Sequence, residues 1–284
     1  MRSSLPSRLL ALLCGVACLS LLGQAIAAPA PETQRIVAAL LEVLDGDSPA
    51  QALRDIAHYR EAGFVYQPAL AVSDETCPTE GDSDQRAVLS GMVTADRTFA
   101  FFFGKPEDAL RENRLLQTFR LDNLPSLSRE EVQVLRKAPQ SARARTIAET
   151  YRKREYAAFV HAASRDAATL RLLGAHIYGV YIERLYMTSI MVLAAAESDQ
   201  LEPLYQVHQS LAAHHGRALA QLADEGVLAG TPEENRRREA LVDRLQALLG
   251  ADNGDKGRPS LDGLRQIVSL TQEERGIYLT PCPL

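Results

Sequence analysis

The pattern of apolar and polar positions is dominated by one stretch, residues 172–196, which is apolar on almost every face of a helix. It reads LLGAHIYGVYIERLYMTSIMVLAAA. A helix of this kind is either a membrane span or the buried centre of an all-helical domain. Glu183 and Arg184 lie at its middle, and each would cost about 2.5–3.5 kcal/mol at the centre of a bilayer. The sequence therefore predicts a buried helix and no membrane span in the mature chain.

The remaining chain predicts further helices separated by turns rich in Gly, Pro and Asp, and no segment alternates as a strand does. Ser128 and Thr231 each precede an acidic residue at the third helical position, which is a typical helix start. We expect an all-α fold of antiparallel helical hairpins stacked around the central helix, as a tetratricopeptide-like or irregular array. The expected helices cover residues 33–44, 48–61, 86–103, 107–123, a segment that begins after 128, 140–163, 165–196, 200–225, 231–250 and 261–270. Whether the last helix continues for a further turn from residue 271 stays open.

A divergent internal repeat supports the stacked arrangement. Gly91 lies in an expected helix that ends at Gly104 and is followed by an antiparallel helix. Gly179 lies in the central helix, which ends near residues 198–199 and is also followed by an antiparallel helix. Stacked helix pairs of this sort build superhelical arrays. Glycine inside a helix costs about 1 kcal/mol relative to alanine. Gly174 and Gly179 therefore indicate that neighbouring backbones approach the central helix closely on two sides.

Two short segments resemble elements of uncharacterised exported helical proteins and lipoproteins. SGMVTAD, residues 90–96, resembles their L-G-V-Y-x-A-D-L-x-Y element, and GAHIYGVYI, residues 174–182, resembles their G-A-W-I-E-G-L-Y element. The resemblance implies an exported all-α fold and no known activity. The matching positions are Gly91, Ala95, Asp96, Gly174, Ala175, Ile177, Gly179 and Tyr181, whereas Val93, Arg97, His176 and Tyr178 depart from the pattern.

The first 27 residues have the pattern of a secretory signal peptide. Arg2 and Arg8 flank the start, residues 9–22 form an apolar run, and residues 25–27 supply the small side chains of a cleavage site. We expect cleavage before Ala28.

Cleavage there would leave a single all-helical domain over residues 28–284 in the periplasm. Two alternatives stay open, lipidation at Cys18 and an uncleaved membrane anchor. The 284-residue chain has a net charge of −5. It has no cluster of Lys and Arg free of acidic neighbours, so we expect no nucleic-acid partner.

Two of the four cysteines, Cys14 and Cys18, would leave with the signal peptide. Cys77 and Cys282 would then be the only thiols exported to an oxidising compartment, and we expect them to form a disulfide. Two free thiols are the alternative. The bond would close a loop of roughly 200 residues, for which chain-entropy models predict a stabilisation on the order of 4–5 kcal/mol.

Four polar side chains are candidates for a ligand site. His176, Glu183 and Tyr186 fall in one stripe of the central helix, beside Gly179. Asp96 lies on an apolar helix face, so it needs a hydrogen-bond donor or a raised pKa. We expect an Arg, a Tyr or a helix N-terminus from another segment as its partner. The alternative for the three residues of the stripe is a mutually satisfied buried network or a helix edge that reaches water, and for Asp96 it is a structural pairing.

The sequence lacks the signatures of common enzyme and metal sites. His208 and His215 fall on one helix face, which we read as an amphipathic surface helix, and there is no HExxH, P-loop or GxSxG motif. We expect no metal and no cofactor. The preferred function is a periplasmic binding or scaffold module for a protein or a small ligand. The alternative is a hydrolase or metal-dependent enzyme that uses Asp96, His176 and Glu183.

Overall fold

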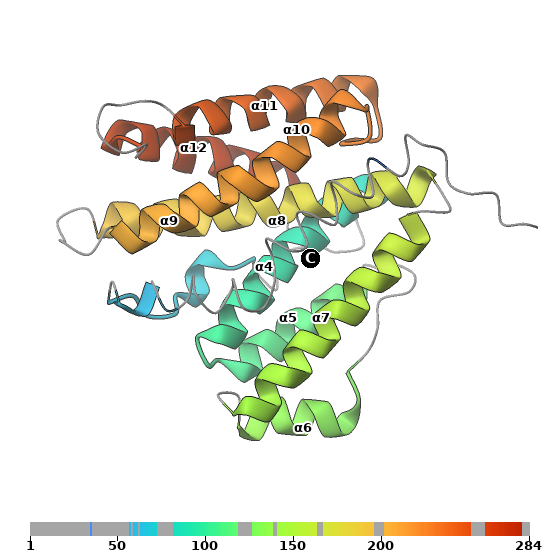
Figure 1. Cartoon of the computed structure of the whole chain (residues 1–284), viewed down its shortest axis with the longest axis vertical. Coiled ribbons are helices and arrows are strands. Elements are labelled where there is room, and N and C mark those ends of the chain that lie inside the picture. Colours follow the sequence, from blue (N-terminus) through green and yellow to red (C-terminus); the bar gives the residue numbers. More distant parts are fainter. Residues whose placement is uncertain are drawn as a thin grey trace, which may run out of the picture.

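The computed structural model describes residues 35, 57, 59–61, 63–72, 82–118, 127–138, 141–163, 167–195, 202–250 and 259–279. All regular elements in these ranges are helices, so the expected all-α class is confirmed (Figure 1). Besides a short 3-10 helix η1 (Pro68–Leu70), they are α4 (Ser83–Phe102), α5 (Pro106–Thr118), α6 (Arg129–Lys137), α7 (Ala142–Ala163), α8 (Ala167–Ala194), α9 (Glu202–Leu211), the π-helical turn η2 (Ala212–Gly216), α10 (Arg217–Asp224), α11 (Pro232–Gly250) and α12 (Leu261–Tyr278).

Within the described residues, the expected helix boundaries agree with the structure to about two residues except at two ends, and the expected end at residue 123 lies outside the described ranges. α4 begins three residues early, because Asp82 and Gln85 form a reciprocal capping box. α12 continues to Tyr278 because Thr271, Glu274 and Arg275 face the interior, although this segment is polar in sequence. The signal peptide and most of the two helices expected before residue 62 lie outside the described residues.

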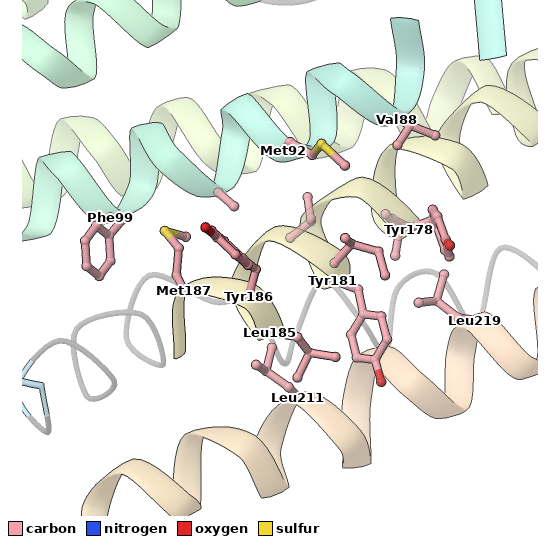
Figure 2. Close-up of a cluster of buried hydrophobic side chains, with 14 of the residues drawn as sticks. Val88, Met92, Phe99, Tyr178, Tyr181, Leu185, Tyr186, Met187, Leu211 and Leu219 are labelled. Atoms are coloured by element: carbon pink, nitrogen blue, oxygen red, sulfur yellow. The ribbon is translucent and has the colours of Figure 1, made fainter. Parts of the chain in front are cut away.

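α8 is the buried centre of the domain, as its apolar sequence predicts. It contacts α4, α7, α9, α10 and α12, and its side chains are buried almost without interruption from Leu173 to Ser189. Figure 2 shows Tyr186 and Met187 directed toward α4, while Tyr181 and Leu185 point toward α9 and α10. Among the described residues, no helix is long and apolar enough to cross a membrane.

Two glycines fix how closely α4 and α8 cross. A Cβ atom built on Gly91 would lie 2.0 Å from the carbonyl oxygen of His176, and one on Gly179 would lie 2.0 Å from that of Val88. Each glycine therefore contacts the carbonyl three residues before its counterpart, so the contact is reciprocal. Gly174 approaches a different segment, since its Cβ would lie 2.7 Å from the Val227 carbonyl oxygen. The expected close approach on two sides of α8 is confirmed.

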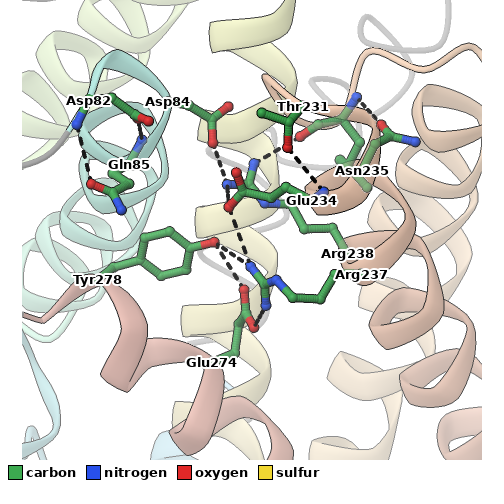
Figure 3. A network of polar contacts seen from close by, with 11 residues as sticks. Asp82, Asp84, Gln85, Thr231, Glu234, Asn235, Arg237, Arg238, Glu274 and Tyr278 are labelled. Atoms are coloured by element: carbon green, nitrogen blue, oxygen red, sulfur yellow. Dashed lines mark hydrogen bonds and ion pairs between the residues drawn. The ribbon is translucent and has the colours of Figure 1, made fainter.

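A second set of contacts joins α11 to the start of α4 and to α12 (Figure 3). The guanidinium of Arg238 is fully buried and pairs with Asp84 and with Glu234, and it donates to the Leu228 carbonyl at 2.9 Å. It also lies 5.1 Å from the centre of the Tyr178 ring, within the range of a cation–π contact. The neighbouring Arg237 pairs with Glu274 of α12. This network anchors the C-terminal helices to the central pair.

We predict that Gly179→Ala, and more strongly Gly179→Leu, destabilises the fold. The added side chain would collide with the backbone of α4, and overpacking of this kind costs about 1–3 kcal/mol or more. Gly276→Ala is the matched control, because Gly276 is helical and a Cβ there would meet no atom within 4 Å. Chemical denaturation measures both variants. Equal stabilities for Gly179→Ala and Gly276→Ala would contradict the close crossing.

Candidate functional site: a buried carboxyl pair

The centre of the candidate site is an ion pair between α8 and α12. The Arg275 guanidinium donates to both carboxylate oxygens of Glu183, Nε to Oε2 at 2.6 Å and Nη2 to Oε1 at 2.9 Å. The Glu183 side chain is fully buried and that of Arg275 is nearly so. A bidentate pair of this geometry offsets much of the cost of removing both charges from water. It explains how a charged residue can occupy the middle of α8.

Asp96 of α4 lies beside this pair. Its Oδ2 accepts a hydrogen bond of 2.8 Å from the backbone N–H of Val72, and the side chain is buried. The expected Arg, Tyr or helix N-terminus is therefore wrong: a loop amide serves as the donor. The other oxygen, Oδ1, has no donor among the described residues. The Asp96 carboxyl group also lies near Glu183, and it lowers the pKa of that residue as a hydrogen-bond donor would.

A shared proton accounts for both observations. Burial raises the pKa of Asp96 well above its ordinary value, and the adjacent Glu183 carboxylate raises it further, against the opposing effect of the Val72 N–H. Burial also raises the pKa of Glu183, whereas the neighbouring Arg275 lowers it. The assignment that satisfies these groups is a neutral Asp96 whose O–H donates to an ionised Glu183. The pair then carries one negative charge, which Arg275 balances.

Aromatic and acidic side chains surround the three charged groups. The Tyr186 ring lies under the Arg275 guanidinium, 3.9 Å from its centre. The negative charge of Glu112 on α5 also raises the pKa of Asp96, and burial together with nearby acidic groups raises the pKa of the Tyr66 hydroxyl. Among the expected site residues, Asp96, Glu183 and Tyr186 therefore come together, with Arg275 as the common cation.

His176 does not join them. Its Nδ1 lies 2.8 Å from the Ser90 hydroxyl, and that hydroxyl donates its own proton to the Ala87 carbonyl at 2.7 Å. With the Ser90 proton directed at that carbonyl, the tautomer that completes this pair has its proton on Nδ1 of His176, which then donates to Ser90. The imidazole holds α8 against α4 about two turns before Glu183.

The histidines of the following helix are also structural in position, and the expected surface location is wrong for two of them. His208 and His215 are each about 1% exposed. His208 Nε2 lies 3.0 Å from the Ser189 hydroxyl, and burial lowers the pKa of His208 to about 4. His215 lies within the π-helical turn Ala212–Gly216, and its ring stacks on the Tyr181 ring at 6.3 Å between centres.

Chemically, the candidate site can hold and release one proton. Nowhere in the described ranges do three or more His, Cys, Asp and Glu side chains gather as a group able to hold a metal ion. Searches of family models, of curated proteins and of solved structures found no match to this chain.

We predict that Arg275→Met destabilises the protein by about 3–5 kcal/mol at neutral pH, because it leaves a buried carboxylate without its cation. The loss should shrink toward acidic pH, where Glu183 takes up a proton. Arg265→Met is the matched control on the same helix. Its pair with Asp262 is largely exposed, so its loss should cost less than about 1 kcal/mol. Similar losses for the two variants, measured by urea denaturation, would contradict the buried pair.

Proposed function

We propose that the protein is an exported helical binding or scaffold module of the periplasm. The observation that carries the proposal is the way the chemically capable side chains are used. Glu183 pairs with Arg275, His176 donates to Ser90, and Asp96 accepts from Val72. Side chains committed in this way stabilise a scaffold, and partner binding is then a property of the surface that the scaffold presents.

The scaffold we propose is a short irregular array of helical hairpins. α4 and α5 form one hairpin around the tight turn at Gly104, whose φ is 76°. α8 and α9 would form the second, and the reciprocal contact of Gly91 with Gly179 relates the leading helices of the two hairpins. Arrays of this kind bury a continuous core between neighbouring units and expose extended faces to partners.

The alternative function, a hydrolase or metal-dependent enzyme, has one observation in its favour. Asp96 and Glu183 come from different helices, and the Glu183 carboxylate raises the pKa of Asp96, as happens in catalytic carboxyl pairs. The third residue of that hypothesis, His176, is committed to Ser90 elsewhere on the same helices. Both carboxyl groups are also buried. The binding function therefore remains the preferred proposal.

The disulfide between Cys77 and Cys282 belongs to the same proposal, and both residues lie outside the described ranges. Its support is a distance along the chain. The Leu70 carbonyl accepts a hydrogen bond of 2.9 Å from Arg275, and each cysteine follows one of these two residues by seven positions. An extended chain covers about 3.3–3.6 Å per residue. The two segments therefore begin at one point, and Cys282 follows the end of α12 at Tyr278 by four positions.

We predict that the protein recovered from the periplasm starts at Ala28 and is lighter by two hydrogen atoms than its reduced form. Intact mass spectrometry without and with reductant measures both features in one sample. A mass that retains the leader, or that includes a lipid on Cys18, would contradict cleavage before Ala28. Alkylation of both cysteines under native conditions would contradict the disulfide.

We predict that the chain from Ala28 onward, immobilised through a tag, retains a specific periplasmic protein. The partner should bind again when purified, with a saturable isotherm in calorimetry. Arg275→Met, which is expected to weaken the fold, should lose binding in proportion to its unfolded fraction, whereas Arg265→Met should retain it. Absence of any reconstituted complex, together with turnover of a hydrolysable substrate that Asp96→Asn abolishes, would favour the enzyme instead.

A further inference from the structure

One short segment covers the carboxyl pair, residues 63–72, here called the strap. It enters through Gly63, whose φ is 80°, contains the 3-10 helix Pro68–Leu70 and leaves in extended conformation at Ala71. Its last residues carry two hydrogen bonds to the candidate site. The Val72 N–H donates to Asp96 at 2.8 Å, and the Leu70 carbonyl accepts from Arg275 at 2.9 Å. Both of these hydrogen bonds therefore end on Asp96 or Arg275, which together with Glu183 are here called the charge cluster.

Before the buried Val72, the strap packs on the core through the partly buried side chains of Phe64, Tyr66 and Leu70. The Tyr66 ring packs at 5.7 Å from the Phe99 ring and at 6.4 Å from that of Phe103, measured between ring centres. Val65 is 64% exposed, and no side chain of the 3-10 helix is fully buried. Segments with few buried contacts open at lower free energy than the core elements around them. The charge cluster therefore has a large share in keeping the strap closed.

The charge of the cluster depends on one proton. While Asp96 is neutral, the single charge of Glu183 is balanced by Arg275 of α12. Once Asp96 ionises, two carboxylates face one guanidinium inside the protein, and the carboxyl group of Glu112 on α5 adds to the repulsion. Tyr66 on the strap and Tyr186 on α8 also lie beside them, and Arg111 of α5 pairs with Glu112 at 2.6 Å. A buried excess of negative charge is costly, and access of water relieves it.

We propose that the strap is a pH-sensitive latch, which stays closed over Asp96 and Glu183 while they share one proton and opens when that proton passes to solvent. The proposal concerns a device within the fold and does not depend on the proposed binding function.

Closure of the strap should weaken with rising pH, because the closed state has the higher proton affinity. Closure by the strap buries Asp96 and raises its pKa above the value in the open, hydrated state. Closure is therefore fully favoured below the ordinary pKa of an aspartate, and it weakens as the pH rises through the raised pKa. The hydrogen bond from the Val72 N–H favours ionised Asp96 and lowers its pKa. Burial and the Glu183 carboxylate both raise that pKa, and each has a larger effect than Val72.

Hydrogen exchange resolved to peptides tests the latch in the folded protein. Protection of residues 63–72 should fall with rising pH by up to tenfold per pH unit, the slope for one proton, after division by the intrinsic exchange rate at each pH. Protection of α8 should stay constant over the same range. Asp96→Asn keeps an acceptor for Val72 and a donor for Glu183 but does not titrate, so its strap should stay protected at every pH. Asp262→Asn, the same change at an exposed site, should behave as the wild type does.

Glu112→Gln gives an independent directional test. Removing this neighbouring negative charge lowers the pKa of Asp96, so the pH at which the strap opens should move downward. Protection of the strap that is independent of pH in the wild type would overturn the proposal. So would an Asp96→Asn strap that opens with rising pH as the wild type does. If Asp96→Asn does not fold, an opening pH that Glu112→Gln leaves unchanged would overturn it instead.

Discussion

The close crossing of α4 and α8 determines where the polar side chains of this fold meet. Because Gly91 and Gly179 each contact a carbonyl of the other helix, the two backbones lie closer than side chains would permit. Asp96 follows the first glycine by five residues and Glu183 follows the second by four, so the two carboxyl groups come together beyond the crossing. Ser90 and His176 meet on the other side of it.

Buried carboxyl groups placed in this way need a nearby cation, and other helices of the molecule provide it. α12 extends far enough to bring Arg275 against Glu183, and the Arg238 network holds α11 and α12 in the required position (Figure 3). Buried ion pairs contribute little net stability compared with apolar packing, but losing one partner is costly. Such pairs therefore act mainly to specify one arrangement of helices that are otherwise uniformly apolar, as α8 is on all its faces.

The sequence predicts the parts of this structure that depend on local patterns. The apolar run of α8, the glycines that demand close packing and the capping box at Ser128 are all confirmed. Local patterns in the sequence could not predict the partners of the buried charges, because Glu183 and Arg275 are 92 residues apart. Arg275 lies in a polar segment after residue 270, where the sequence pattern leaves a further helical turn open. Asp96 was assigned the wrong class of partner, since a backbone N–H leaves no signal in the sequence. The burial of His208 depends on packing in the same way.

The strap connects these long-range partners to the segments that lead to Cys77 and Cys282. The Leu70 carbonyl joins it to Arg275, and Cys77 and Cys282 follow these residues at equal distances along the chain. The proposed disulfide would tether the strap to the end of α12 without adding any contact to Asp96 or Glu183. A tether restricts how far a segment moves and lowers the entropy it gains on opening. Oxidation would then favour the closed strap at every pH, whereas protonation would set the pH at which it opens. Because the bond acts on chain entropy and the proton on charge, the two effects on the closing free energy should add.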